Sequence, residues 1–123
     1  ALAVWCALKA HGRRGYQAVV EQCCANAAAF AAWVAAQPGL ELLAPARLNI
    51  VCFRFAPAGL SAERTDALNR EAVAAIRADG RAFVSGTVWQ GKVALRAAFD
   101  NWATSVRDVA LLQEAIAEVG ARG

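Results

Sequence analysis

Residues 82–99 read AFVSGTVWQGKVALRAAF, and this stretch decides the fold. Apolar and β-branched residues lie on both sides of a short connection, Trp-Gln-Gly at positions 89–91. A connection of that size with a glycine in it is typical of a β-hairpin. We therefore expect two neighbouring strands, at residues 82–88 and 92–99, as the centre of a sheet.

The sheet is expected to gain strands from the sequence upstream of the hairpin. Residues 47–55, RLNIVCFRF, are rich in β-branched and aromatic side chains and form the strongest single strand candidate. Residues 40–43 are a shorter candidate, which Pro45 interrupts. The sheet then has three or four strands, in an antiparallel or mixed arrangement.

Two helices are predicted between and after these strands. Ser61 is placed to cap a helix that runs to about Ala78. Its buried face is predicted to consist of Leu68, Ala72, Ala75 and Ile76. The last helix begins after Thr104 or Ser105, ends at Gly120, and has Asp108 placed for a capping box with Ser105. Strands with separate helices favour an α+β layer, a sheet covered by helices.

Two further helices are expected before the first strand. Residues 2–10 form a short apolar helix that stops at two nearby glycines, and residues 16–36 follow with their larger apolar residues on one helical face. Neither helix has a strand of its own. We therefore expect residues 1–37 to be the end of a larger domain or a connector, and residues 38–123 to form a small α+β domain.

Composition excludes several classes of function. The net charge of +3 comes from scattered arginines with no basic run among aromatics, which argues against nucleic-acid binding. The longest uninterrupted apolar stretch, residues 27–36, is about half of a bilayer span, which argues against a membrane protein. The four cysteines form no CxxC pair and His11 is not spaced for zinc, so no metal site is predicted and a reducing cytoplasm is expected.

Few residues are suited to catalysis. Lys9 lies in an apolar helix and Lys92 at a hairpin edge, where solvated lysines are commoner than Schiff-base lysines. The run Ser85-Gly86-Thr87 is a candidate ligand contact, because hydroxyls flank a glycine that permits close backbone approach; a β-bulge at the glycine explains the run equally well.

Arg96 is the most informative polar residue. Val93, Leu95, Ala97 and Phe99 take one face of its strand, so Arg96 lies on the other face, flanked by alanines. A guanidinium with space around it suits bidentate capture of a carboxylate. The alternative is an ion pair with Asp100 or Glu41 on a solvated face, and the spacing alone favours that alternative.

Three runs carry a resemblance to a known family. They are VWCALKAHGRRGYQAVVEQC, then LNIVCFRF, then GRAFVSGTVWQGKVALRAAFDNWATSVRDV, in this order and spacing. Together they resemble the carboxy-terminal third of the group II pyridoxal-phosphate (PLP) dependent decarboxylases, which act on aromatic amino acids, glutamate or diaminobutyrate.

The resemblance implies the small carboxy-terminal domain of a fold-type-I homodimer that releases CO2 from an L-amino acid. It places Arg96 on the arginine that contacts a substrate carboxylate in glutamate-specific members. The family's Schiff-base lysine and its other PLP-binding residues have no counterpart here, so the chain is expected to hold no cofactor and to be inactive by itself. The chain also lacks methionine, which suggests a fragment of a longer protein, with the amino-terminal large domain as its missing partner.

Two other interpretations remain open. The chain could be a stand-alone α+β binding or dimerisation module, in which residues 1–36 pack onto residues 40–123. It could instead belong to a PLP-fold enzyme with other lyase or transferase chemistry. The fragment interpretation predicts an exposed apolar surface around Val4, Trp5 and Leu8, where a large domain would sit.

Overall fold

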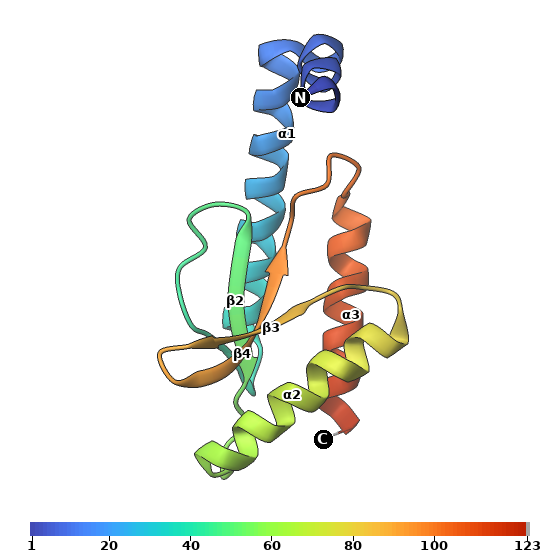
Figure 1. Cartoon of the computed structure of the whole chain (residues 1–123). Helices are drawn as coiled ribbons and strands as arrows, with labels where there is room; N and C mark the ends of the chain where they lie inside the picture. Colours follow the sequence, from blue (N-terminus) through green and yellow to red (C-terminus); the bar gives the residue numbers. More distant parts are fainter. Residues whose placement is uncertain (123) are drawn as a thin grey trace.

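The computed structural model describes residues 1–122 as three helices and a four-stranded sheet (Figure 1). The elements are α1 (Leu2–Ala36), β1 (Leu40–Leu42), β2 (Ile50–Phe55), α2 (Ala62–Asp79), β3 (Ser85–Trp89), β4 (Lys92–Ala98) and α3 (Val106–Arg122). The strand order is β1-β2-β4-β3 and every pairing is antiparallel. This confirms the predicted α+β class with an antiparallel sheet.

The hairpin of β3 and β4 forms where the sequence predicts it. Its connection is the two-residue turn Gln90-Gly91, whose φ angles of 48° and 78° are the positive values that a type I′ turn requires. β3 begins three residues later than predicted, at Ser85. The reason lies in α2, because the Arg77 Nε donates to the Val84 carbonyl at 2.9 Å and holds that residue against the helix instead of in the sheet.

β2 also begins later than predicted, at Ile50 instead of Arg47. Asn49 closes the pairing, since the Phe99 amide donates to its carbonyl at 2.8 Å and its own side-chain amide donates to the Phe99 carbonyl at 3.1 Å. Beyond this point there is no partner strand, so residues 47–49 lie in a loop.

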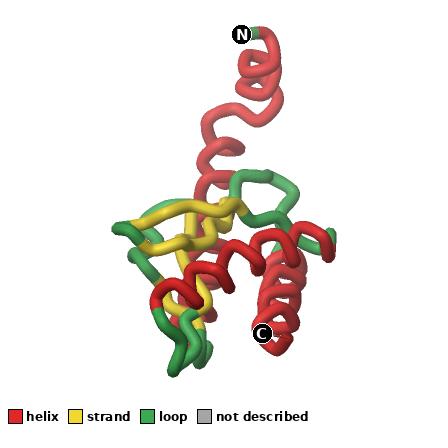
Figure 2. The backbone as a smooth tube through the Cα atoms, turned by 60° about the horizontal axis from the view of Figure 1, so that its bottom comes forward, coloured by secondary structure: helices red, strands yellow, loops and turns green. Residues whose placement is uncertain are grey.

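α1 contains the predicted break between two helical segments. Gly12 adopts φ 61° and ψ −176°, which interrupts the helix, and Gly15 allows the His11 side chain to lie close to the backbone, where an added Cβ would be 2.9 Å from the His11 Cβ. Figures 1 and 2 show the first segment extending beyond the sheet, away from the rest of the molecule. By length and composition α1 could span a membrane, but its second segment is a core helix of the α+β unit.

The core lies between one face of the sheet and the three helices. Its members are apolar residues of α1 from Cys23 onward, the inward residues of β2 and β4, and one stripe of each of α2 and α3. Phe30 is central, with ring centroids of Trp33, Phe53 and Phe99 at 5.8, 5.4 and 5.7 Å. Such aromatic clusters contribute burial and edge-to-face contacts together.

α2 is capped as predicted, since the Ser61 hydroxyl accepts from the Arg64 amide at 3.3 Å. Its buried face differs in one residue: Ala72 and Ile76 are buried and Leu68 packs against the core, but Ala75 is exposed. Asn69 is buried instead, because its side chain bonds both the amide and the carbonyl of Phe55 at 2.8 Å. This polar lock joins α2 to the end of β2.

α3 begins after Ser105, whose amide and hydroxyl both donate to Asp108 Oδ2 at 2.7 Å. The predicted buried residues Val109, Leu112 and Ile116 lie in the core, with Val119 packed against it. The predicted end at Gly120 is wrong, because the helix continues to Arg122. Gly120 serves packing, since a Cβ there would lie 3.1 Å from the Phe55 ring.

The proposed division between residues 37 and 38 stays a prediction. Residues from Cys23 to Val34 share the core of the α+β unit, whereas the preceding part of α1 is almost entirely outside it. Gly123, the last residue of the predicted second domain, lies outside the described residues.

Candidate functional site

Arg96 lies in the middle of the sheet on the face away from the helices. Its cross-strand neighbours are Cys52 on β2 and Ser85 on β3. Val93, Leu95, Ala97 and Phe99 are buried on the opposite face, as predicted. The two alanines that flank Arg96 on its own face differ in solvent exposure: Ala98 is exposed and Ala94 is fully buried. Arg96 is exposed, so the sheet presents its guanidinium to solvent.

Ser85 holds one side of this guanidinium. The Arg96 Nε donates to the Ser85 Oγ at 3.2 Å, and the Ser85 hydroxyl lies 3.4 Å from the Arg96 carbonyl. The two terminal amines of Arg96, Nη1 and Nη2, have no hydrogen-bond partner among residues 1–122. In an arginine whose two terminal amines are free, these amines can donate two parallel hydrogen bonds to a carboxylate.

The run Ser85-Gly86-Thr87 does not act as one contact surface. Ser85 and Thr87 share the face of Arg96, but Gly86 faces α2, where an added Cβ would lie 3.6 Å from a methyl group of Val73. The pairing from Ser85 to Trp89 continues in unbroken register, so a bulge does not explain the glycine. Ligand binding by these three residues stays a prediction.

The predicted alternative for Arg96, an ion pair with Asp100 or Glu41, is wrong in this structure. Within residues 1–122 Arg96 forms no ion pair. Glu41 is directed elsewhere, because it lies 2.8 Å from the Lys92 Nζ and 4.0 Å from the Arg54 Nε. Arg96 therefore keeps its charge available at the surface.

The thiol next to Arg96 is protonated at neutral pH. Burial raises the pKa of Cys52 above its ordinary value, and the positive charge of Arg96 offsets only part of that shift. A thiol with a raised pKa is a poor nucleophile. Cys52 therefore provides a small, neutral wall beside the guanidinium.

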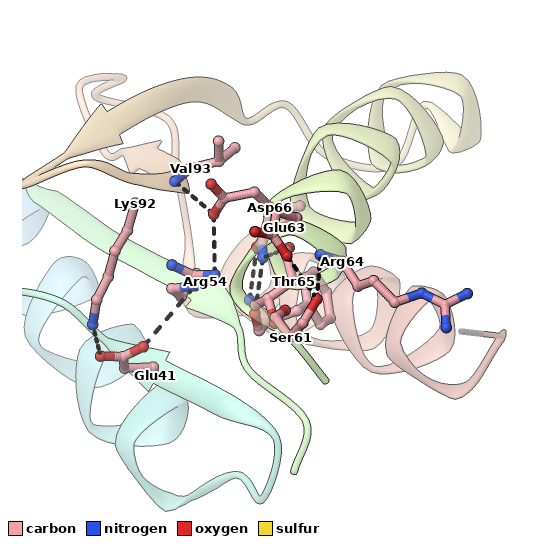
Figure 3. Close-up of polar contacts among 11 residues, drawn as sticks. Glu41, Arg54, Ser61, Glu63, Arg64, Thr65, Asp66, Lys92 and Val93 are labelled. Carbon is pink, nitrogen blue, oxygen red and sulfur yellow. Dashed lines mark hydrogen bonds and ion pairs between the residues drawn. The ribbon is translucent and has the colours of Figure 1, made fainter. Parts of the chain in front are cut away.

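A second polar cluster, not found by reading the sequence, surrounds Arg54 (Figure 3). Arg54 is only 5% exposed, and its Nη2 lies 3.2 Å from Asp66 Oδ1, an oxygen that also accepts from the Val93 amide at 3.1 Å. Glu41 joins the cluster from β1 and pairs with Lys92 on β4. The cluster links β1, β2, β4 and the first turns of α2, so its role is structural.

One signal in the sequence indicated this cluster. Arg54 stands between two buried aromatic residues, Phe53 and Phe55, in an otherwise apolar strand. A charge buried in such a strand needs partners to offset its desolvation. The identity of those partners depends on tertiary structure.

The residues of this chain do not fit PLP. The Lys9 Nζ lies over the Trp5 ring at 5.7 Å, and the Lys92 Nζ is paired with Glu41 at 2.8 Å, so each of these amines already has a partner. A pyridinium nitrogen needs a free carboxylate as its partner, but Asp66 is already bonded to Arg54 and to the Val93 amide. No step through PLP follows from these residues. In the described part of the chain, no cluster of three His, Cys, Asp or Glu side chains could hold a metal.

Comparison with known proteins identifies the family. The model of the pyridoxal-dependent decarboxylase conserved domain matches residues 1–56. Tyrosine decarboxylase 2 of Arabidopsis thaliana is 31% identical over 95 residues, which is 77% of this chain. The chain belongs to the pyridoxal-dependent decarboxylase family. Phenylacetaldehyde synthase of the same plant is 29% identical over 79% of the chain.

Solved structures of the decarboxylase family share the fold. The crystal structure of Oryza sativa TDC with PLP and tryptamine superposes with a TM-score of 0.88 at 25% identity over 96% of this chain. The chain covers only 26% of that structure, and 17% and 20% of the two Arabidopsis relatives. This decarboxylase region therefore corresponds to 17–26% of the length of these proteins.

Proposed function

We propose that the chain is the carboxy-terminal region of a PLP-dependent amino-acid decarboxylase, which releases CO2 from an L-amino acid. The single observation that carries the proposal is the uneven burial of α1. Trp5 and Leu8 are 57% and 51% exposed, and Leu2 and Val4 are also exposed, whereas Phe30 and Val34 are fully buried. Apolar side chains gathered on one protruding segment indicate a surface that another part of the protein covers.

The covering part is, in this proposal, the amino-terminal large domain of the same polypeptide. The small share of each relative that the chain spans supports this assignment. A stand-alone module requires residues 1–36 to pack onto the sheet, and within that range only Val19 and residues from Cys23 onward lie in or against the core. The uneven burial therefore favours the fragment over the module.

Arg96 is proposed to contact a carboxylate of the substrate. Its exposed position, its free terminal amines and its lack of an acidic partner within residues 1–122 all support this role. The names of the relatives, which include a tyrosine and a tryptophan decarboxylase, favour an aromatic amino acid as the substrate. In the parent enzyme Arg96 would then bind the carboxylate and orient the amino acid.

The cofactor is proposed to be held by the rest of the parent polypeptide. PLP supplies an electron sink at the substrate α-carbon. Because the residues of this chain do not fit PLP, we expect the isolated chain to bind none and to be inactive. We expect the parent to be a cytoplasmic homodimer that contacts neither nucleic acid nor membrane.

Aldehyde formation is a second candidate, favoured by the phenylacetaldehyde synthase relative. The two reactions yield different products from the same aromatic amino acid, an amine or an aldehyde. Product analysis of the complete polypeptide with L-tyrosine, L-phenylalanine and L-tryptophan separates them. Amine with CO2 supports the decarboxylase, and aldehyde supports the synthase.

The 123-residue chain is tested directly for PLP binding and for activity. PLP is added, the mixture is reduced with borohydride, and adducts are located by mass spectrometry in the chain and in a Lys9→Arg/Lys92→Arg control. We expect no saturable adduct at either lysine and no CO2 from the three amino acids. A stoichiometric adduct at Lys92 together with CO2 release would overturn the proposal.

A further inference from the structure

We infer that Ser85 is a positioning residue for Arg96, which fixes how the guanidinium meets a carboxylate. This inference rests on the proposed function of Arg96 and goes beyond it, because it assigns the role of a second residue and the direction of ligand approach. Ser85 is not placed in contact with the substrate itself.

The geometry supports this division of roles. An arginine guanidinium can bind a carboxylate through its two terminal amines or through Nε and one terminal amine. Here the Nε already donates to the Ser85 Oγ at 3.2 Å. The carboxylate is therefore left with the edge formed by Nη1 and Nη2, and it approaches along the long axis of the side chain.

The backbone makes Ser85 suited to this task. Ser85 and Arg96 are register partners in neighbouring antiparallel strands, so their side chains leave the sheet side by side. The Ser85 hydroxyl can also donate to the Arg96 carbonyl, which lies at 3.4 Å, and this leaves its oxygen free to accept from Nε. An exposed arginine otherwise populates many rotamers, and this contact removes several of them.

Among residues 1–122 no acidic side chain pairs with Arg96. On the other side of Arg96 the register partner is Cys52, a thiol and not a carboxylate. The nearest acidic residue of the edge strand β1, Glu41, is held by Lys92 at 2.8 Å. The ligand class is therefore a carboxylate bound end-on, with its plane aligned with the guanidinium.

The first test measures the contact itself in the 123-residue chain. Solvent exchange of the Arg96 Nε proton is followed by nitrogen-15 NMR in the unaltered chain, in Ser85→Ala and in Ser85→Thr. Ser85→Ala should speed exchange about 2- to 10-fold, the range expected for the loss of one hydrogen bond, and Ser85→Thr should restore the slow rate. Equal exchange in all three chains would overturn the inference.

The second test measures carboxylate binding in the same samples. Acetate is titrated while the backbone amide signals of residues 85 and 96 are followed in every variant, with acetamide as the uncharged control. Ser85→Ala should weaken acetate binding about 2- to 10-fold, and Arg96→Gln should abolish it. Unchanged binding in Ser85→Ala contradicts the positioning role alone. Unchanged binding in Arg96→Gln contradicts the proposed function of Arg96, whatever Ser85 does.

The complete polypeptide gives a third readout. A positioning residue acts on how the substrate is bound, so Ser85→Ala should raise KM about 2- to 10-fold with a smaller change in kcat, and Ser85→Thr should recover most of the loss. A merely structural role would lower the amount of folded enzyme and leave KM unchanged. That pattern, with circular dichroism showing less folded protein, would contradict the inference.

Discussion

The two parts of α1, residues 2–22 and residues 23–36, have opposite environments, and the charged residues of the helix (Lys9, Arg13, Arg14 and Glu21) all lie in the first part. Both are rich in alanine and larger apolar residues, yet the segment before Cys23 is largely exposed and the segment after it lies in the core. Within residues 1–122 the sheet and α3 cover the second part, whereas of the first part only Val19 packs against the core. A helix can therefore carry apolar side chains along its whole length and bury only one part of them within residues 1–122.

The largest expected effect comes from the buried segment. Phe30→Ala removes a fully buried ring that contacts three other aromatic residues, and it should lower the free energy of unfolding by about 3–5 kcal/mol. Urea denaturation followed by circular dichroism measures this. Phe83→Ala is the matched control, because Phe83 is exposed and should change stability by less than about 1 kcal/mol. Equal losses in the two variants would remove the distinction on which the comparison depends.

The polar cluster around Arg54 should give the second-largest change in stability. Asp66→Ala leaves the buried Arg54 without its closest carboxylate and the Val93 amide without its acceptor, at a cost of about 2–3 kcal/mol. Asp66→Asn keeps an oxygen that can accept both bonds, so it should cost clearly less in the same denaturation experiment. If the two variants unfold alike, the hydrogen bonds of Asp66 do not stabilise the fold.

In the exposed part of α1, the effect of a substitution should depend on whether the rest of the polypeptide is present. Trp5→Ala in the 123-residue chain should change the free energy of unfolding by no more than about 0.5 kcal/mol, because Trp5 is exposed and lies outside the core cluster. In the complete polypeptide the same change should lower the thermal midpoint measurably, because a covered tryptophan is lost. A large loss already in the short chain would show that Trp5 belongs to its core.

The smallest effect concerns a surface cluster that joins α2 to α3. Arg81 lies 2.6 Å from both Asp79 Oδ1 and Glu118 Oε2, and it lowers the pKa of each carboxyl below ordinary values of 3.8 and 4.5. A lowered folded-state pKa gives stability that is present above the ordinary pKa and lost as pH falls through the folded value. Stability should therefore decline below about pH 5. Arg81→Gln should flatten that decline in acid titrations, and an unchanged profile would contradict the role of the cluster.

The hairpin could be predicted from the sequence because its determinants are local. Glycine in the connection and β-branched residues in both strands define it. The cross-strand partner of Arg96 could not be predicted from the sequence. A change of one residue in the length of the turn would give Arg96 a different partner. A two-residue turn at Gln90-Gly91 pairs Trp89 with Lys92 and so brings Ser85 beside Arg96. A three-residue connection would shift this register and place another residue there.

Other features depended on distant parts of the chain. Helix termination at Gly120 was a reasonable local prediction, but close contact with Phe55 explains the glycine better. The burial of Asn69 and Arg54 follows from α2 crossing the end of β2, which no periodicity encodes. The apolar pattern of α1 was read correctly, but the sequence pattern alone does not say that its first segment lacks a cover.

The central claim is that residues 1–22 are covered by the rest of a larger decarboxylase. Hydroxyl-radical footprinting of Trp5 and Leu8 tests it most directly, with the 123-residue chain and the complete polypeptide labelled side by side. The account predicts strong labelling of both residues in the short chain and protection of both in the complete polypeptide, with Phe30 protected in each. Equal labelling of Trp5 and Leu8 in the two proteins would contradict it.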